Sequence, residues 1–96
     1  MDITYKMHRY VVEFLGTMFL MCVILLTGNY LAIGAALAII VLLGGNTSGG
    51  AFNPAVTIGM VMGKQLPISD LFPYIAAEVM GAVMAMEFVK LIRGKV

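Results

Sequence analysis

One long run of uncharged residues constrains this chain more than any other feature. Between Tyr10 and Gly63 the only formally charged side chain is Glu13. A membrane span needs only about 20 apolar residues, so this run has room for more than one span. Charged residues are 11% of the sequence and the mean hydropathy is +1.01, whereas soluble domains average about 25% charged residues. The sequence therefore predicts an integral, multi-pass membrane protein and excludes a soluble globular domain.

Composition also excludes several classes of function. The net charge of +1 is too small to indicate a nucleic-acid partner, and the single cysteine cannot form an internal disulfide. His8 has no metal-ligand spacing around it, and the nine methionines are expected to serve in packing. The sequence offers no nucleophile with a matching base and no phosphate-binding loop. We therefore expect a protein that is not an enzyme, with no metal site, no cofactor and no catalytic residue.

The apolar blocks predict three membrane spans, at residues 10–28, 30–45 and 70–92. Gly28 and Asn29 form a turn signal, and so short a link makes the first two spans antiparallel neighbours. The first stretch is too long for the apolar core of a usual signal peptide, so we expect it to remain as a span. The expected partner of these helices is the lipid bilayer.

The flanks of the spans are expected to carry caps, anchors and close contacts. Ser69 is the predicted cap of the third span, with Asp70 in its first turn. Tyrosines beside the spans are predicted to lie at the membrane interface: Tyr5, Tyr10, Tyr30 and Tyr74. Small residues are predicted at sites of close helix approach: Gly16, Gly34, Gly49, Gly59 and Gly81.

The segment 46–63, between the second and third spans, predicts a re-entrant loop. Its first part is rich in glycine and small polar residues, which favour irregular backbone. The apolar stretch Ala55–Gly63 follows, and its helix would reach only about 14 Å, half of the membrane. Asn53 is a preferred N-cap and Pro54 a preferred first helical residue. A half-helix therefore begins near the membrane midplane, where an Asn53 amide can meet a passing neutral oxygen while the helix dipole opposes cations.

Three motifs resemble those of the aquaporin family. Ser48–Gly59 reads SGGAFNPAVTIG and resembles the family's first signature loop, which contains the Asn-Pro-Ala motif. EFLGT at Glu13–Thr17 resembles its first-helix motif, and AEVMGA at Ala77–Ala82 its third-helix motif. Family members have about twice this length and contain two inverted repeats. The resemblance implies that residues 1–96 are a single repeat with half of an aquaporin-like fold: an all-α membrane protein with three transmembrane helices and one re-entrant half-helix.

The resemblance also implies roles for individual residues. The predicted pore and selectivity residues are Ile33, Gly50, Asn53, Pro54, Ala55 and Val56. Glu13 and Glu78 lie within spans, where a carboxylate is costly unless it faces protein or water. The resemblance implies that both accept hydrogen bonds from the re-entrant loop. A proton relay is the alternative role for this pair.

The chain departs from the family's pattern at its predicted constriction. Val56 follows Asn-Pro-Ala where the family's second loop carries an arginine, and Ala51 replaces a common histidine. Ile33 falls where the family often places an aromatic filter residue. A pore built only from this chain would therefore have an apolar constriction, which leaves water, glycerol-like solutes and small gases open as permeants.

The expected function is a passive channel for water or small neutral solutes. One half-helix reaches only the midplane, so we expect a second from the opposite face, supplied by an inverted homodimer or higher homo-oligomer, or by a separate second-repeat chain. Basic residues are balanced three against three between the predicted faces, as dual topology requires: Lys6, Arg9 and Lys64 against Lys90, Arg93 and Lys95. A non-conducting fragment or interaction subunit and a proton-coupled transporter are the alternatives.

Overall fold

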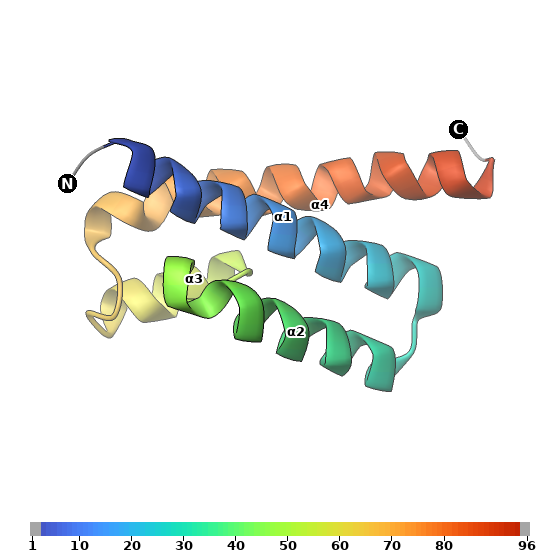
Figure 1. The fold of residues 1–96 in the computed structure, drawn as a ribbon, viewed down its shortest axis with the longest axis horizontal. Helices are drawn as coiled ribbons and strands as arrows, with labels where there is room; N and C mark the ends of the chain where they lie inside the picture. The colour runs from blue at the N-terminus through green and yellow to red at the C-terminus, as the bar shows by residue number, and fades with distance from the viewer. Residues whose placement is uncertain (1–2, 95–96) are drawn as a thin grey trace.

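A computed structural model describes residues 3–94 of the chain, and these residues form helices and no strand. In chain order they are α1 (Ile3–Thr27), α2 (Tyr30–Ser48), α3 (Pro54–Met62) and α4 (Leu71–Arg93), with a short 3-10 turn at Ile68–Asp70 before α4 (Figure 1). Two of them, α1 and α2, are long and apolar enough to cross a membrane. The described residues are therefore all-α, as the predicted spans and the family resemblance imply.

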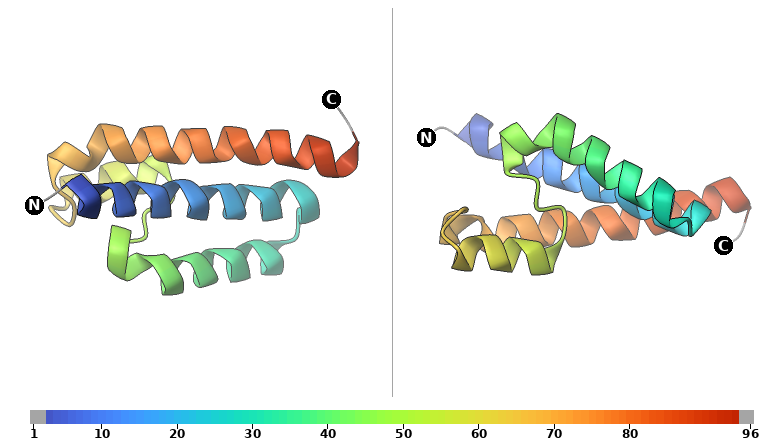
Figure 2. Two further views of the ribbon diagram at one scale, coloured as in Figure 1. Left: turned by 45° about the horizontal axis from the view of Figure 1, so that its top comes forward. Right: turned by 90° about the horizontal axis from the view of Figure 1, so that it is seen from below.

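Helix α1 is the central element of the bundle. It packs against α2 on one side and α4 on the other, and α3 packs against α4 (Figure 2). Gly28 and Asn29 alone connect α1 to α2, so these two helices run antiparallel, as predicted. The Asn29 side chain caps α2 by accepting hydrogen bonds from the backbone N–H groups of Leu31 and Ala32, at 2.9 and 3.0 Å.

Each long helix buries only a few residues against its neighbours. On α2 the buried residues recur every fourth position, which places them on one face: Ala36, Ile40, Gly44 and Ser48. Most of the remaining surface of α2 is apolar, and Leu42 and Leu43 are more than three-quarters accessible. The hydrocarbon core of a lipid bilayer contains no hydrogen-bonding groups. Apolar side chains on the outside of the bundle can therefore contact lipid without leaving a polar group unpaired.

The chain between α2 and α4 returns to the end of the bundle that it left. From the C-terminal end of α2 it turns back toward the middle, and α3 then runs to the end where α4 begins (Figures 1 and 2). Gly49 and Gly50 have φ angles of +92° and +74°, a backbone that only glycine adopts readily, so they permit this sharp reversal. The N-terminus of α3 consequently lies near the middle of the bundle.

Two arginines fasten α1 to α4, one at each end. Arg9 of α1 forms a buried ion pair with Asp70, just before α4. At the other end, Arg93 donates hydrogen bonds to the carbonyls of Leu25 and Leu26, at 2.7 and 3.4 Å. These carbonyls lie in the last turn of α1, where the backbone C=O groups have no hydrogen-bond partner within the helix. The partial negative charge at the C-terminus of a helix also favours a cation such as Arg93.

The start of α4 differs from the prediction. Ser69 lies inside the 3-10 turn and caps no helix, and the Asp70 side chain makes no capping hydrogen bond either. The prediction of a Ser69 cap is therefore wrong. The physical reason is that Asp70 turns into the bundle to meet Arg9, and this tertiary contact determines the local backbone.

Candidate functional site

The Asn53 side chain caps the N-terminus of α3. The Asn53 Oδ1 atom accepts hydrogen bonds from the N–H groups of Ala55 and Val56, at 2.7 and 3.4 Å, and the Asn53 carbonyl accepts one from Thr57 at 2.8 Å. Pro54 occupies the first helical position and has no N–H to satisfy. The predicted cap is thus confirmed. The Asn53 Nδ2 group donates no hydrogen bond within residues 3–94, and the side chain is exposed.

Glu13 of α1 contacts the loop that precedes this cap. Its carboxylate is fully buried and accepts hydrogen bonds from the Ser48 hydroxyl at 2.6 Å and from the Phe52 N–H at 2.7 Å. Both donors belong to the segment that carries the chain from α2 to α3. A buried charge is tolerable when its oxygens are paired in this way.

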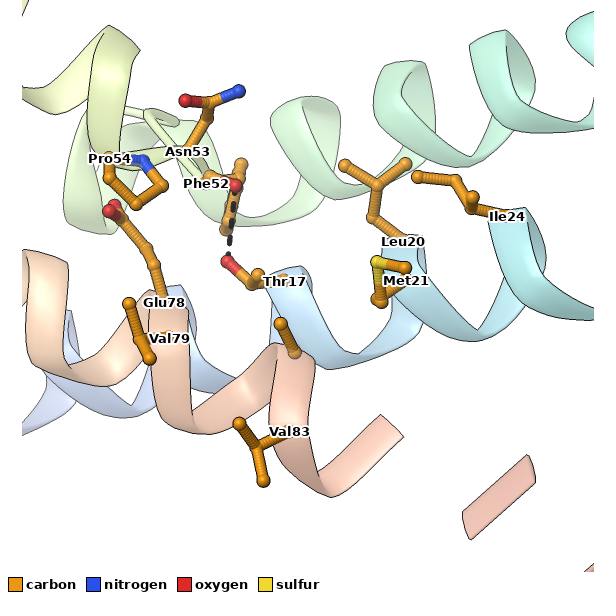
Figure 3. Close-up of a pocket in the computed structure, with 11 residues that line it drawn as sticks. Thr17, Leu20, Met21, Ile24, Phe52, Asn53, Pro54, Glu78, Val79 and Val83 are labelled. Carbon is orange, nitrogen blue, oxygen red and sulfur yellow. Dashed lines mark hydrogen bonds between the residues drawn. The ribbon is translucent and has the colours of Figure 1, made fainter. Parts of the chain in front are cut away.

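Phe52 contributes to the site although sequence reasoning did not select it. It is 2% exposed and has a φ of +53°, a left-handed conformation that costs a residue with a side chain about 1–3 kcal/mol. Its carbonyl accepts a hydrogen bond from the Thr17 hydroxyl at 3.2 Å (Figure 3). Its ring fills the space left by the missing side chain of Gly16, and it reaches Gly44 as well. These contacts fix the residue directly before Asn53.

Tyr74 holds the same loop from α4. Its hydroxyl donates to the Ser48 carbonyl at 2.6 Å, and the side chain is completely buried. The prediction that Tyr74 is an interface anchor is therefore wrong. A buried tyrosine needs a partner for its hydroxyl, and the end of α2 provides one in a carbonyl that has no helical partner. By contrast, Tyr30 is 80% exposed beside the turn between α1 and α2.

Glu78 of α4 contacts α3 itself. Its Oε2 atom accepts a hydrogen bond from the Thr57 hydroxyl at 2.7 Å, and both side chains are buried. The other oxygen, Oε1, is the one buried side-chain nitrogen or oxygen atom among the described residues that has no hydrogen-bond partner. Native interiors leave few such atoms unpaired, so this one calls for an explanation.

A hollow of about 330 Å³ lies beside the N-terminus of α3, between α1 and α4 (Figure 3). Its walls come from one face of α1, one face of α4 and the residues at the N-terminus of α3. The lining residues are Thr17, Leu20, Met21, Ile24, Phe52, Asn53, Pro54, Glu78, Val79, Ala82 and Val83. Apart from Thr17, Asn53 and Glu78, these side chains are apolar. The hollow therefore has polar groups gathered at the tip of α3 and apolar walls beyond it.

Of the remaining predicted pore residues, three belong to the segment around this tip and one does not. Ala55 and Val56 are exposed in the first turn of α3, and Gly50 is half-buried in the loop. Ile33 is half-buried on α2 and does not line the hollow. The structure therefore brings Asn53 and Pro54 together with Glu78, and it leaves Ile33 apart from them.

The glycines divide into two groups. Gly16 and Gly81 confirm the prediction of close approach, since a side chain at Gly16 would collide with the Phe52 ring and one at Gly81 would meet the Phe14 carbonyl at 2.5 Å. At Gly34 and Gly59 a Cβ atom would meet nothing within 4 Å. The prediction is wrong for these two within the described chain, because both face outward.

Comparisons with known proteins show which family this sequence resembles. The sequence model of the major intrinsic protein family matches residues 26–96. Glycerol uptake facilitator protein-like 6 of Lactiplantibacillus plantarum is 38% identical, over 88% of this chain and 43% of its own length. Aquaporin Z of Brucella melitensis is 43% identical, over 60% of this chain and 25% of its own length. Aquaporin Z of Rhodopseudomonas palustris is 39% identical, over 70% of this chain and 28% of its own length. No solved structure matches significantly.

The chain spans less than half of the length of these curated relatives. The family model nevertheless matches most of the chain, including α2, the loop that follows it, α3 and α4. Aquaporins and glycerol facilitators are integral membrane channels and not enzymes. With its two membrane-capable helices, this chain belongs to the major intrinsic protein family and is an integral membrane protein.

Proposed function

We propose that the chain forms a passive membrane channel for water or small neutral solutes, in which two copies pair in inverted orientation. One observation carries this proposal: the half-helix α3 begins in the middle of the bundle, with the Asn53 amide exposed at its tip. A donor at that place, on a helix end that carries a partial positive charge, favours a neutral oxygen-bearing solute over a cation.

The proposed topology has α1, α2 and α4 as the three spans and residues 49–63 as the re-entrant segment. The spans have 25, 19 and 23 residues, enough at about 1.5 Å per residue to cross a hydrocarbon core of about 30 Å. Helix α3 has nine residues, which gives it only about 14 Å, half of that thickness. A continuous pore therefore needs a second half-helix from the opposite face.

An inverted second copy is the simplest source of that half-helix. The charges near the two ends of the bundle support it. Lys6, Arg9 and Lys64 belong to one end of the described bundle and Lys90 and Arg93 to the other, while Lys95 lies outside the described residues. The rule counts lysines and arginines, and acidic partners matter little to it. The sequence balance of three against three therefore gives no strong charge bias against insertion in both orientations.

The proposed permeants follow from the chemistry of the loop tip and from the relatives. Asn53 offers hydrogen-bond donors, Val56 behind it is apolar and 45% exposed, and no basic residue lies in the loop. Three relatives carry the name Aquaporin Z and one is named as a glycerol uptake facilitator-like protein. Water and small polyols are therefore the first solutes to test.

The test is solute flux into proteoliposomes, measured by stopped-flow light scattering. Asn53→Ala removes a cap worth about 1 kcal/mol together with the exposed amide, and we expect flux to fall to near the rate of empty vesicles. Asn29→Ala is the matched control, because Asn29 caps α2 through the same two kinds of contact but lies at the turn outside the proposed pore. That variant should conduct like the unaltered chain.

Equal flux in the Asn53→Ala and unaltered proteins would contradict the proposed pore. Loss of flux in both asparagine variants would also contradict it, because the cause would then be helix capping rather than the position of the amide.

A further inference from the structure

Two buried carboxyl groups meet at a close contact between α1 and α4. A side chain at Gly81 of α4 would collide there with the Phe14 carbonyl of α1. Glu13 precedes Phe14, and Glu78 lies three positions before Gly81. Both glutamates are almost completely buried, and the Glu13 carboxyl lies within hydrogen-bonding reach of Glu78. Two carboxyl groups at such a distance do not both ionise readily, because their negative charges repel where water does not screen them.

The hydrogen-bond donors around Glu78 are too few for an ionised carboxylate. The Thr57 hydroxyl donates to Oε2 at 2.7 Å, and the Asn53 backbone N–H faces the carboxyl group without forming a hydrogen bond. The remaining neighbour is the Glu13 carboxyl, and an ionised carboxylate only accepts hydrogen bonds. An ionised Glu78 would therefore leave its buried Oε1 atom facing a second acceptor.

The basic residues of the neighbouring helices do not compensate this pair of acids. Arg9, the basic residue of α1 nearest to the contact in sequence, forms its ion pair with Asp70. On α4, Lys90 and Arg93 lie about 18 Å or more beyond Glu78 along the helix. Helix α3 contains no titratable residue. A proton is therefore the simplest group that can satisfy both carboxyls.

We propose that Glu13 and Glu78 share one buried proton, which Glu78 holds on Oε1 and donates to the Glu13 carboxylate. Glu78 then donates through Oε1 and accepts from Thr57 through Oε2, so neither oxygen is left unpaired. Glu13 already accepts two hydrogen bonds, and a carboxylate has acceptor sites for more. The negative charge stays on Glu13 because that residue has more donors to stabilise it.

This proton connects the two segments that position the tip of α3. Glu13 holds the loop after α2 through the Ser48 hydroxyl and the Phe52 N–H. Glu78 holds the first turns of α3 through Thr57. The hydrogen bond between the two glutamates joins these contacts into one buried network. Glu78 is thus a positioning residue that acts as a donor. The inference goes beyond the proposed channel, because the proton belongs to the fold whether or not the chain conducts.

Infrared spectroscopy detects such a proton directly, because the carbonyl stretch of a protonated carboxyl group lies apart from the bands of a carboxylate. The purified full chain is measured at neutral pH in an alkyl maltoside, a detergent without a carbonyl group. We expect a protonated-carboxyl band in the unaltered chain and its loss in Glu78→Gln, whose amide N–H replaces the acid O–H. Glu87→Gln is the matched control, since it removes an exposed carboxyl group from the same helix, and it should keep the band.

Two spectroscopic results would overturn the proposal. Absence of the band in the unaltered chain would mean that both carboxyls are ionised, with a water molecule as the partner of Oε1. Persistence of the band in Glu78→Gln would place the proton on another carboxyl group.

The pH dependence of stability gives a second, independent readout. As the pH rises, Glu78 of the unaltered chain loses its proton and the two carboxylates repel, so the midpoint of thermal unfolding should fall. In Glu78→Gln the amide N–H is present at every pH, so its midpoint should fall less over the same range. Glu87→Gln should follow the unaltered chain. Parallel profiles for the unaltered chain and Glu78→Gln would overturn the proposal.

These measurements are separate from the test of the proposed function. Neither requires the protein to conduct, so their failure leaves the proposed channel standing. Failure of the flux test likewise leaves the buried proton in place.

Discussion

Arg9 and Asp70 form a buried ion pair, with 2.5 Å between the guanidinium nitrogen and the carboxylate oxygen, across 61 positions of sequence. The Tyr10 hydroxyl donates a further hydrogen bond to Asp70 at 3.3 Å, and the Arg9 guanidinium lies over the Tyr74 ring at 5.3 Å. This cluster joins the first turns of α1 to the start of α4, at the end of the bundle where α2 ends and to which α3 returns. The cluster therefore fixes the position of α1 relative to the start of α4, against which α3 packs.

Removing one partner of this pair should destabilise the fold strongly. Asp70→Ala leaves a buried guanidinium without its counter-charge, and we expect the free energy of unfolding to fall by about 3–5 kcal/mol. The double variant Arg9→Met with Asp70→Leu removes both charges and should lose much less. Denaturant titration in detergent micelles, followed by far-UV circular dichroism, measures both. Losses of equal size in the two variants would mean that the charge pairing is not what holds these elements together.

Position 16 of α1 should tolerate no side chain, because the Phe52 ring occupies the space beside Gly16. Gly16→Ala places a methyl group against the Phe52 ring, and overpacking of this kind costs about 1–3 kcal/mol. Gly34→Ala is the control, since nothing lies within 4 Å of that position on α2, and replacing an exposed helical glycine stabilises by about 0.5–1 kcal/mol. The two variants should shift the midpoint of thermal unfolding in opposite directions. A similar shift in both variants would contradict the close packing of the Phe52 ring against Gly16.

Glu13 should act as a hydrogen-bond acceptor and not as a proton carrier. Glu13→Gln keeps an acceptor for the Phe52 N–H, whereas Glu13→Leu leaves this N–H and the Ser48 hydroxyl unpaired, at about 1–3 kcal/mol each. We therefore expect Glu13→Gln to fold and to retain most of the flux, and Glu13→Leu to lose stability and flux together. Flux that depends on pH in the unaltered chain and disappears in Glu13→Gln would favour the proton relay instead.

Tyr74 should contribute through its hydroxyl as well as its ring. Tyr74→Phe leaves the Ser48 carbonyl at the end of α2 without its 2.6 Å hydrogen bond, so stability should fall by about 1–3 kcal/mol. Tyr30→Phe is the control, because Tyr30 is 80% exposed, and surface substitutions change stability by less than about 0.5 kcal/mol. Chemical denaturation of both variants under one set of conditions provides the comparison. Equal stabilities would show that the loop does not need this contact.

Local chemistry made the start of α3 predictable. Asn53 and Pro54 are adjacent in sequence, and the cap that they form depends only on the next few backbone N–H groups. The turn at Gly28 and Asn29 was predictable for the same reason. Glu13 was selected because a carboxylate in an apolar helix demands a partner, although only the structure shows that the partners are Ser48 and the Phe52 N–H.

Long-range contacts account for what sequence reasoning missed. Arg9 looked like a flanking charge and Tyr74 like an interface residue, because their partners are 61 and 26 positions away along the chain. Phe52 gave no signal, since its importance lies in its left-handed backbone and in the space left by Gly16, neither of which a sequence pattern records. The Ser69 cap failed because a distant arginine determines the orientation of Asp70.

The opposite placement of the two chain ends has a consequence for engineering. Ile3 begins α1 at one end of the bundle and Gly94 follows α4 at the other. A second copy joined to the first by a short linker after residue 96 would start where the first copy stops and would run back the other way. A head-to-tail fusion of two identical genes would therefore produce an antiparallel pair of bundles, with no change to the sequence of either half.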